Sequence, residues 1–511
     1  MRWHDLLAGL DRAGYQVVRA GDPDLEITAI THDSRQALPG TCFACIPGAV
    51  TDGHDHAGAA VARGAVALLV ERPLSLDVAQ VEVPSVRAAL GPVAATFFDH
   101  PSAAMRVLGV TGTNGKTTTT YLLEMIAQHD ERQDEGGAGA GGRARVGVVG
   151  TVGARVAGES IGRATSGAHT TPEASDLQAL LARMRDAGAT TVAMEVSSHA
   201  LHQHRIDGVQ FAAVCFTNLS HEHLDYHGSL DAYFEAKASL FTRARTPAAA
   251  SNLDDPRGAE LATRAARDGI DLWTYAVDDA AADVGATDVL FGAHSTRATL
   301  VDRRGGDHAV VELPLVGSFN LANALAAAAT ARAAGFAFAT VTAGLAEPLV
   351  VPGRMERVDA GQPFAVLVDY AHTPDALRQV LAAARPLTGA AGRVICVFGC
   401  GGDRDPGKRP LMGEAVAEGA DVAVLTSDNP RSEDPQAIAD AVLPGLTGAA
   451  ALRVQLDRRA AIAAALADAT SGDVVVLAGK GHETGQTSNG HTVPFDDRVV
   501  AREELEALGW S

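Results

Sequence analysis

The sequence predicts an α/β protein of three domains, because its length, its composition and its pattern of apolar runs all favour that class. A chain of 511 residues is too long for a single hydrophobic core. Its hydrophobic fraction of 47% is typical of a well-packed globular protein. Short apolar runs alternate with helical stretches along most of the chain, which is typical of parallel sheets with crossover helices.

The first predicted domain covers residues 1–101. Its opening segment, MRWHDLLAGLDRAGY, has the apolar spacing of an amphipathic helix and lacks the apolar core of a signal peptide. The runs ITAI, TCFACI, VALLV and VEVPSV are separated by Gly, Pro and Asp, which predicts strands interleaved with one or two helices. We therefore expect a small α/β unit that ends near His100 and Pro101.

The second and third domains are predicted at residues 102–350 and 351–511. In the second, the strand-like runs RVGVVG, TTVAMEVS, AAVCFTN and AAASN alternate with helical segments such as DLQALLARMRDAG. The polar, Gly-rich segment 129–145 predicts a flexible surface insertion. A helix around residues 320–334 precedes LVVPGRMERV, whose Pro-Gly pair predicts a hinge. The runs FAVLVDY, RVICVFG, DVAVLTSDN and DVVVLAGKG then predict the buried parallel strands of the third domain.

Charge and cysteine usage narrow the class of partner and compartment. The formal net charge of −20 argues against nucleic acid or an anionic membrane as the main partner. No stretch offers about 20 uninterrupted apolar residues, so no membrane insertion is expected. The odd number of cysteines, all in apolar runs, predicts reduced thiols in a cytoplasmic compartment. Cys42 and Cys45 have the spacing of a metal or redox pair, but zinc would need a second pair of ligands, so a structural role is favoured.

A phosphate-binding loop is predicted at residues 112–118, between the apolar run MRVLGVTG and the helical run TTYLLEMIAQ. Such a turn between a strand and a helix lets backbone N–H groups and the helix dipole hold phosphates. Lys116 would neutralise the β and γ phosphates, and the Thr117 hydroxyl would face Mg²⁺. The strict Walker pattern requires Gly at Val110, so a variant loop is indicated. The expected architecture is a central P-loop parallel-sheet ATPase domain flanked by a small N-terminal α/β domain and a C-terminal Rossmann-like α/β domain.

The variant loop resembles that of the Mur ligases, which attach amino acids to UDP-N-acetylmuramic acid during peptidoglycan synthesis, and that of the related folylpolyglutamate synthetases. Further motifs follow in the order of the Mur ligases: Thr170-Thr-Pro172, Glu195-Val-Ser-Ser-His199, His223-Leu-Asp-Tyr-His-Gly228, Lys237, Asn320-Leu-Ala-Asn323, Asp369-Tyr-Ala-His372 and Gly479-Lys-Gly-His-Glu483. Within the family, the N-terminal motifs resemble those of members that add the third residue of the stem peptide: Asp33-Ser-Arg35 and Thr51-Asp-Gly-His54. The motif Asp428-Asn-Pro-Arg431 is similar to that of members that add meso-diaminopimelate.

The resemblance implies an ATP-dependent, ADP-forming amide ligase. It would add meso-diaminopimelate to UDP-N-acetylmuramoyl-L-Ala-D-Glu through an acyl phosphate, in cytoplasmic peptidoglycan precursor synthesis. The substrate carboxylate and the γ-phosphate are both anionic, so their approach requires cations between them. The implied catalytic residues are Lys116, Glu195, His223 and Lys237, and the implied ligands of two Mg²⁺ ions are Thr117, Glu195, His223 and Lys237, the lysine as a CO₂-derived carbamate.

Without the resemblance, the sequence also allows non-catalytic roles for these residues. Glu195 ends the apolar run TTVAME and could be a solvated carboxylate at the end of a strand. Lys237 could be an ordinary surface lysine. His223 would be an unusual ligand, because Mg²⁺ prefers oxygen donors.

Two further groups are implied to bind the nucleotide substrates. The ATP group is Gly112, Thr113, Asn114, Gly115, Lys116, Thr117, Thr118, Asn320, Arg354, Asp369 and His372. The UDP-sugar peptide group is Ser34, Ala49, Val50, Thr51, Thr170, Thr171, Ser197, Gln203 and Arg205, whose donors suit anionic oxygens. The threonine pair could also form the N-cap of the helix PEASDLQALL. Asp369 and His372 could instead belong to a buried polar network between domains.

The amino-acid site is the part that decides specificity. Diaminopimelate differs from lysine by a distal carboxylate, which the forked guanidinium of Arg grips better than the ammonium of Lys. The implied set is Arg404, Asp428, Asn429, Pro430, Arg431, Gly479 and Glu483, with the two arginines on the carboxylate and Glu483 on the distal ammonium. A plain Asn-Pro turn is the alternative for the motif at 428–431. The glycines at 399–402 do not match a dinucleotide fingerprint, whose sixth position is Arg404 here, so NAD binding is rejected.

Three other functions remain to be weighed against this one. The nearest is a ligase of the same family that adds L-lysine. A folate-type glutamate ligase would leave the motif at 428–431 unexplained. A P-loop regulatory ATPase without ligase activity belongs to a different class. We expect small-molecule substrates only and a monomeric protein.

Overall fold

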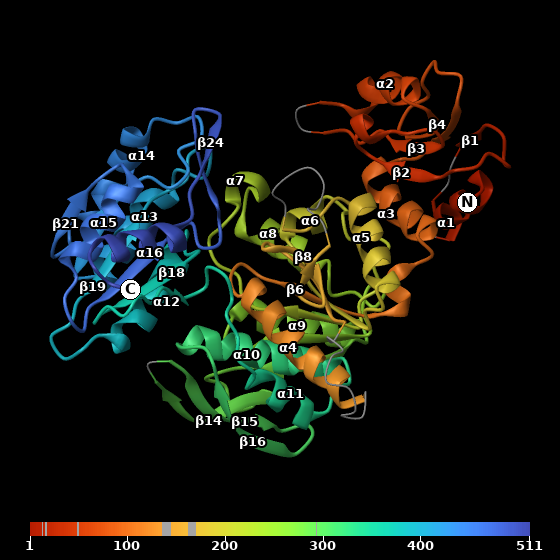
Figure 1. Cartoon of the computed structure of the whole chain (residues 1–511). Coiled ribbons are helices and arrows are strands. Elements are labelled where there is room, and N and C mark those ends of the chain that lie inside the picture. Colours follow the sequence, from red (N-terminus) through yellow and green to blue (C-terminus); the bar gives the residue numbers. More distant parts are fainter. Residues whose placement is uncertain (13, 16–17, 49–50, 135–144, 162–169, 293) are drawn as a thin grey trace.

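The computed structural model describes residues 1–12, 14–15, 18–48, 51–134, 145–161, 170–292 and 294–511. They form three α/β units in chain order, each built around its own sheet (Figure 1). In Figure 1 the N-terminal unit (red) and the C-terminal unit (blue) lie on different sides of the central unit. The predicted class, α/β with three domains, is confirmed.

The N-terminal sheet has five strands in the order β1-β5-β4-β3-β2, and all pairs except β1 with β5 are parallel. These strands are β1 (Val18–Ala20), β2 (Ala29–Thr31), β3 (Thr41–Ala44), β4 (Ala65–Val70) and β5 (Ala79–Glu82). The helices are α1 (Trp3–Arg12), α2 (Ala57–Ala62) and α3 (Val86–Phe97). Cys42 and Cys45 are buried and free, and burial raises the pKa of each thiol to about 12. Both cysteines therefore act as core residues.

The central sheet has eleven strands in the order β16-β15-β14-β13-β12-β11-β6-β10-β7-β8-β9. Its parallel centre is β6 (Arg106–Thr111), β7 (Gly147–Gly150), β10 (Thr191–Glu195), β11 (Ala213–Phe216), β12 (Ala248–Asn252) and β13 (Asp271–Tyr275). The apolar runs predict all of these strands except β13. They do not predict the strands added at the two edges either, which are β8 (Gly153–Val156), β9 (Glu159–Ser160), β14 (Val284–Phe291), β15 (Thr296–Asp302) and β16 (Asp307–Leu313). All of these pair antiparallel except β14 with β13, which is parallel.

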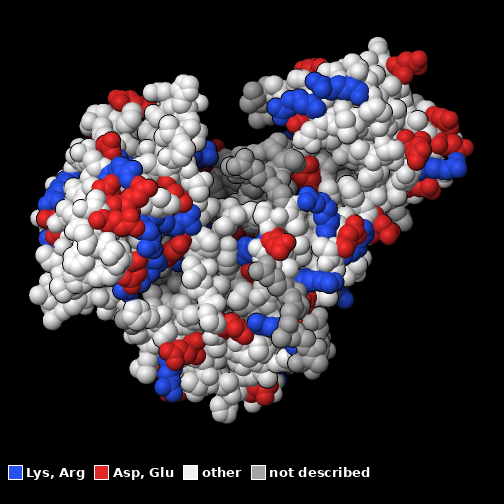
Figure 2. Space-filling view, viewed as in Figure 1, with Lys and Arg blue, Asp and Glu red and all other residues white. Residues whose placement is uncertain are grey.

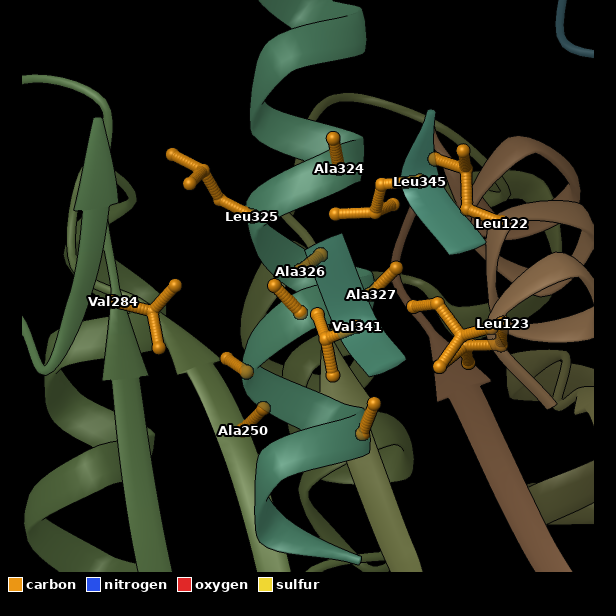
Figure 3. Close-up of a cluster of buried hydrophobic side chains, with 14 of the residues drawn as sticks. Leu122, Leu123, Ala250, Val284, Ala324, Leu325, Ala326, Ala327, Val341 and Leu345 are labelled. Carbon is orange, nitrogen blue, oxygen red and sulfur yellow. The ribbon is translucent and has the colours of Figure 1, made fainter. Parts of the chain in front are cut away.

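The helices of the central domain are α4 (Lys116–Asp134), α5 (Ala174–Asp186), α6 (Ser198–His202), α7 (Leu224–His227), α8 (Leu230–Ala238), α9 (Pro256–Arg267), α10 (Ser318–Ala333) and α11 (Phe338–Leu345). Helix α10 is rich in Ala, so neighbouring elements approach it closely. Figure 3 shows its Leu325 side chain toward Val284 of β14, and Leu345 of α11 beside Leu122 and Leu123 of α4. Because α4 begins at the predicted phosphate loop, this core fixes the position of the loop.

Helix α4 corrects one prediction. Residues 129–134 form its last turns rather than part of a surface insertion. There, Nδ1 of His129 and Nη2 of Arg132 lie 3.3 Å and 3.0 Å from Oε1 of Glu347. These contacts with Glu347 stabilise the end of α4, so the helix continues into a segment whose polar composition predicts an insertion. The rest of the segment, 135–144, lies outside the described residues.

The C-terminal sheet has six strands in the order β17-β18-β22-β19-β20-β21, parallel except for β17. The strands are β17 (Glu356–Arg357), β18 (Ala365–Asp369), β19 (Val394–Phe398), β20 (Val422–Leu425), β21 (Leu452–Val454) and β22 (Val474–Ala478). The helices are α12 (Pro374–Ala384), α13 (Lys408–Gly419), α14 (Pro435–Val442), α15 (Arg458–Asp468) and α16 (Asp497–Ala507). A hairpin of β23 (Gly485–Ser488) and β24 (His491–Pro494) follows β22. Apolar clusters on both sides of the sheet are typical of a Rossmann-like layer.

The domain boundaries predicted after residues 101 and 350 fall outside all of these sheets, at the 3₁₀ turn Pro101–Ala104 and between α11 and β17. Figure 2 shows a broad hollow between the N-terminal and C-terminal domains, above the central one. None of the helices in the described ranges is both long and apolar enough to cross a membrane.

Candidate active site at the domain junction

The predicted phosphate loop joins β6 to α4 and packs directly on the end of β11. A Cβ atom on Gly112 would lie 1.9 Å from Oγ1 of Thr217, so no larger residue fits there. The backbone N–H of Thr113 donates to the carbonyl of Asn218 at 2.9 Å. Nζ of Lys116 donates to the carbonyl oxygens of Gly112 and Thr113 at 2.9 Å and 2.8 Å. The first N–H groups of α4 have no partner within the helix, which makes the loop suited to an anion.

Replacing Gly115 with Ala is expected to weaken ATP binding by at least about tenfold. Gly115 has φ +85°, and a Cβ atom there would lie 2.2 Å from Oδ1 of Asn323. Left-handed strain alone costs about 1–2 kcal/mol. Gly269→Ala separates the two effects, because Gly269 has φ +72° and nothing within 4 Å of the added atom. Both variants should lose stability in urea, and only Gly115→Ala should lose binding of a fluorescent ATP analogue. Wild-type binding by Gly115→Ala would contradict the placement of ATP.

Glu195 lies at the end of β10, beside the loop, and is 2% exposed. Oγ1 of Thr117 donates to its Oε1 at 3.0 Å. Nη2 of Arg354, from the segment that enters the C-terminal domain, donates to the same Thr117 hydroxyl at 3.2 Å. The reading of Glu195 as a solvated carboxylate is therefore wrong, and the predicted residues Thr117, Glu195 and Arg354 meet at one point.

Lys237 of α8 is 1% exposed, so the reading as a surface lysine is also wrong. Its Nζ donates to the carbonyl of Gly112 at 2.8 Å and lies 4.4 Å from the centre of the Tyr233 ring. Lys116 donates to the same carbonyl oxygen. Burial, followed by repulsion from Lys116, holds the pKa of Lys237 well below its ordinary value. The site thus favours the neutral amine at this position.

His223 precedes α7 and has φ +56°, a backbone strain often found at functional positions. Its ring centre lies 4.7 Å from that of His199 and 6.0 Å from that of Tyr233. Burial lowers the pKa of His223 to about 2, so the imidazole is neutral. Within the described ranges, no three His, Cys, Asp or Glu side chains are arranged to hold a metal ion. A metal at this site therefore needs further oxygen donors, from a hydroxyl, a phosphate or a carbamate.

A cavity of 490 Å³ opens between the central and C-terminal domains. Predicted residues Asn320 and Arg354 line it together with apolar side chains, among them Leu349 and Phe364. Nδ2 of Asn320 donates to the carbonyl of Val316 at 2.9 Å. The lining also includes the amide of Gln362 and the charged side chains of Glu356 and Arg357. Apolar walls combined with hydrogen-bonding groups suit a flat heteroaromatic base.

Asp369 is the last residue of β18, and His372 lies in the turn after it. Oδ1 and Oδ2 of Asp369 accept from the N–H groups of Ala371 and Met355, each at 2.8 Å, and burial raises the pKa of this carboxyl. Nε2 of His372 lies 3.8 Å from Oε2 of Glu222 in the central domain. His372 therefore does take part in a polar network between domains, as the alternative interpretation predicted. Asp369 instead fixes the backbone at Met355, next to Arg354.

Glu222 extends this network, because its Oε1 lies 3.4 Å from Nζ of Lys408 on α13. Asn114 of the phosphate loop adds a second link, since its Nδ2 donates to Oδ2 of Asp375 on α12 at 3.3 Å. Polar contacts thus hold the C-terminal domain against the phosphate loop.

The predicted UDP-sugar residues of the central domain form one hydrogen-bonded cluster. Oγ1 of Thr171 donates to the carbonyl of Glu195 at 2.9 Å and accepts from the N–H of Ser197 at 3.1 Å. Nη1 of Arg205 donates to the carbonyl of Thr171 at 3.0 Å, and its Nη2 donates to Oε1 of Gln203 at 2.6 Å. This cluster connects directly to Glu195, so the predicted substrate and metal residues share one scaffold.

The alternative role of the threonine pair as a helix N-cap is wrong. Helix α5 begins at Ala174 with Glu173 in the cap position, and Oε1 of Glu173 pairs with Nε of Arg205 at 3.0 Å. The hydroxyl of Thr171 instead holds the end of β10. The extended Thr-Pro segment keeps both threonines outside the helix.

The remaining predicted UDP residues lie in the N-terminal domain. Ser34 begins a 3₁₀ turn capped by Asp33, and Thr51 is exposed. Ala49 and Val50 lie outside the described residues. Nδ1 of His32 lies 3.1 Å from Oγ of Ser175 on α5, which joins this domain to the central one. Ser34 and Thr51 therefore lie on a separate domain from the Thr171 cluster, as the two ends of a long substrate would require.

Asn429 is the centre of the predicted amino-acid site. Its Nδ2 donates to Oε2 of Glu483 at 2.8 Å and to Oδ1 of Asp428 at 3.0 Å. Oδ2 of Asp428 is buried, with no hydrogen-bond partner among the described residues. Gly479 faces that oxygen, and a Cβ atom there would lie only 2.5 Å from it. A buried acceptor of this kind is suited to an ammonium group.

The two predicted arginines flank Gly401. Nη1 of Arg431 donates to the carbonyl of Gly402, and the Arg431 backbone N–H donates to the carbonyl of Thr487 at 3.0 Å. Arg404 is exposed, and its Nη1 lies 3.3 Å from the carbonyl of Asp403. Pro430 is buried and precedes Arg431, which has φ +54°. A plain Asn-Pro turn does not account for this strained, hydrogen-bonded arrangement.

Three residues without a predicted role also belong to the site. Lys480 is fully buried, and its Nζ lies 3.2 Å from Oε2 of Glu483. Thr151 donates twice to Glu195, and Lys408 pairs with Glu222. Only Lys480 carried a sequence signal, because it lies within the motif Gly479–Glu483.

Comparison with known proteins agrees with this arrangement. Three family descriptions match: "Mur ligase family, catalytic domain" at residues 26–100, "Mur ligase middle domain" at 110–331 and "Mur ligase, glutamate ligase domain" at 353–481. The UDP-N-acetylmuramoyl-L-alanyl-D-glutamate–2,6-diaminopimelate ligase of Gloeobacter violaceus is 44% identical over 512 residues, covering 99% of this chain and 98% of that protein. The enzyme of the same name from Streptomyces coelicolor is 44% identical over 500 residues, covering 96% and 94%.

A solved structure with that enzyme name superposes with a TM-score of 0.69 at 33% identity and covers 100% of both chains. Family descriptions, relatives and fold all agree over nearly the whole length. The chain belongs to the Mur ligase family.

Proposed function

We propose that the chain joins meso-diaminopimelate to UDP-N-acetylmuramoyl-L-Ala-D-Glu through an amide bond, with hydrolysis of ATP to ADP and phosphate. The contact between Arg354 and Thr117 carries the proposal, because it brings the domain of the amino-acid site onto the phosphate loop. The substrate carboxylate attacks the γ-phosphorus of ATP and releases ADP. The amine of diaminopimelate then attacks the acyl phosphate, loses a proton and releases phosphate.

The residues beside the loop fit divalent cations. Thr117 and Glu195 offer hard oxygen donors and would hold one Mg²⁺ with the phosphates of ATP. His223 and a carbamate on Lys237 would hold a second. Mg²⁺ supplies charge neutralisation between the carboxylate and the γ-phosphate. Lys116 would supply a cation on the loop, and Arg354 adds another beside Thr117.

The carbamate on Lys237 is supported by the crowding of two amines on one carbonyl. Lys116 and Lys237 both donate to the oxygen of Gly112. The lowered pKa of Lys237 supplies the neutral amine that reacts with CO₂. The carbamate would place an anion where an ammonium is disfavoured, and that anion would balance the charge of Lys116.

The other substrates follow from the two remaining clusters. Thr170, Thr171, Ser197, Gln203 and Arg205 would bind the diphosphate, sugar and peptide, and Ser34 and the turn at 49–51 would bind the uridine end. Arg431 and Arg404 would bind the distal carboxylate of diaminopimelate, and Asp428 and Glu483 its distal amine. The enzyme would act as a monomer in the cytoplasm on small molecules only.

The test is ATP-dependent phosphate release with UDP-N-acetylmuramoyl-L-Ala-D-Glu in three parallel reactions, with meso-diaminopimelate, L-lysine or no amino acid. Release only with diaminopimelate is expected, with a matching mass gain of the product. Release with L-lysine alone would keep the family and overturn the specificity. Release that ignores both amino acids would indicate a regulatory ATPase instead.

A further inference from the structure

Thr151, in the turn between β7 and β8, holds the carboxylate that faces the phosphate loop. We propose that Thr151 is a positioning residue. It fixes the orientation of Glu195 for a divalent cation and links that carboxylate to Thr170, next to Thr171 in the proposed UDP-sugar peptide site. The inference rests on the proposed function, in which Glu195 receives Mg²⁺.

Thr151 contacts both oxygens of the Glu195 carboxylate. Its backbone N–H donates to Oε1 at 2.9 Å, and its Oγ1 donates to Oε2 at 2.9 Å. Because the last torsion of Glu is broad, two bonds from one residue select a single carboxylate plane. A carboxylate has about four acceptor positions, and Thr117 occupies another. The vacant acceptor position is then on Oε2, held in a fixed direction.

The backbone around Thr151 is shaped for this contact. Strands β7 and β10 are adjacent and parallel, with Val149 opposite Met194, so Gly150 and Glu195 are the next residues on each strand. A Cβ atom on Gly150 would lie 2.4 Å from Oε1 of Glu195. Gly150 therefore lets the turn approach the carboxylate closely.

The turn is anchored to the helix that carries Thr117. Nε of Arg155 on β8 donates to Oε1 of Glu124 on α4 at 3.1 Å, and its guanidinium lies 4.1 Å from the centre of the Tyr121 ring. Glu124 is 3% exposed, so this ion pair is shielded from solvent. The β7–β8 turn and the start of α4 are thus held at a fixed separation, with Glu195 between them.

The same hydroxyl reaches the proposed acceptor-substrate site. Oγ1 of Thr151 lies 3.2 Å from Oγ1 of Thr170. Thr171 binds the backbone of Glu195 from the other side. A substrate seated on the two threonines would therefore act on the orientation of Glu195 through Thr151.

The test compares Thr151→Val, which removes the hydroxyl but keeps the shape and the backbone N–H, with Thr151→Ser, which keeps the hydroxyl. Mn²⁺ binding to the full chain in the presence of ADP is followed by electron paramagnetic resonance of the free ion. Loss of a group that orients a metal ligand costs about 10–100-fold in affinity. We expect that loss in Thr151→Val and near wild-type affinity in Thr151→Ser. Thr299→Val on β15 is the matched control and should bind Mn²⁺ as the wild type does.

The outcomes separate this inference from the proposed function. Equal Mn²⁺ affinity in Thr151→Val and the wild type overturns the inference, whatever the ligation assay shows. Weakened Mn²⁺ binding in Thr151→Val, restored in Thr151→Ser, supports it even in a protein that ligates nothing. Equal loss in Thr151→Val and Thr151→Ser would show a packing role and overturn it, and thermal melting of each variant shows whether the fold is retained.

Discussion

Replacing Lys237 with Ala is expected to lower the rate of ligation by about 10²–10³-fold, because the anion that balances the loop would be lost. The amine is buried and donates to the carbonyl of Gly112, the same atom that Lys116 contacts. Without the carbamate, the proposed second cation would lose one of its two proposed ligands and keep only His223. The rate is measured as phosphate release with all three substrates, together with product mass.

Two comparisons show whether the carbamate or the charge of the lysine matters. Lys237→Arg keeps a cation but cannot form a carbamate, so it should be as inactive as Lys237→Ala. Added formate or acetate should restore part of the activity in Lys237→Ala, where the cavity admits a carboxylate, and none in Lys237→Arg. Glu235→Ala, an exposed position on the same helix, should stay active. Full activity of Lys237→Arg would contradict the carbamate.

A direct measurement uses ¹³C-labelled bicarbonate and carbon NMR of the wild-type protein. A carbamate signal is expected, because burial lowers the pKa of Lys237 and so favours the neutral amine that reacts with CO₂. The signal should fall as the pH falls, since protonation of the amine opposes the reaction with CO₂. It should be absent from Lys237→Arg at every pH.

Most of the parallel strands could be predicted because strands buried on both faces form continuous apolar runs. Val474–Ala478 is buried at every residue and reads as such a run. The antiparallel β16 could not be predicted in the same way. Its buried and exposed positions alternate from Ala309 to Leu313, but Val310 on the exposed face is apolar, so the sequence DHAVVEL does not show this alternation. Sheet edges depend on which strands pair, and apolar content does not encode pairing.

In the site, too, contacts between residues close in sequence could be predicted, and contacts between distant residues could not. Lys116 and Thr117 could be predicted, because loop and helix are contiguous in sequence. Thr151 could not, since its bond to Glu195 joins residues that are 44 positions apart. Only the adjacency of β7 and β10 brings them together. A residue such as Thr151, which lies outside every motif and acts only through a neighbouring strand, could not be predicted from the sequence.

Replacing Arg431 with Ala is expected to lower kcat/KM for meso-diaminopimelate by about 10²–10⁴-fold. Two hydrogen bonds to a carboxylate at about 1.5–3 kcal/mol each give this range, at about 1.4 kcal/mol per factor of ten. The guanidinium is already oriented, because Nη1 donates to Gly402 and the backbone is tied to Thr487. The measurement is the rate of product formation over a range of diaminopimelate concentrations.

Competition with L-lysine makes this prediction specific to the distal carboxylate. Lysine lacks that group, so its poor use should not become poorer in Arg431→Ala, and the preference for diaminopimelate should shrink by the same factor. Arg431→Lys keeps the charge and the positive φ but loses the forked guanidinium. Its preference for diaminopimelate should therefore lie between that of the wild type and that of Arg431→Ala. Arg453→Ala, on the exposed edge strand β21, is the control and should match the wild type. An unchanged preference in Arg431→Ala would place the carboxylate on Arg404 instead, since that side chain lies across Gly401 and is the second arginine of the predicted set.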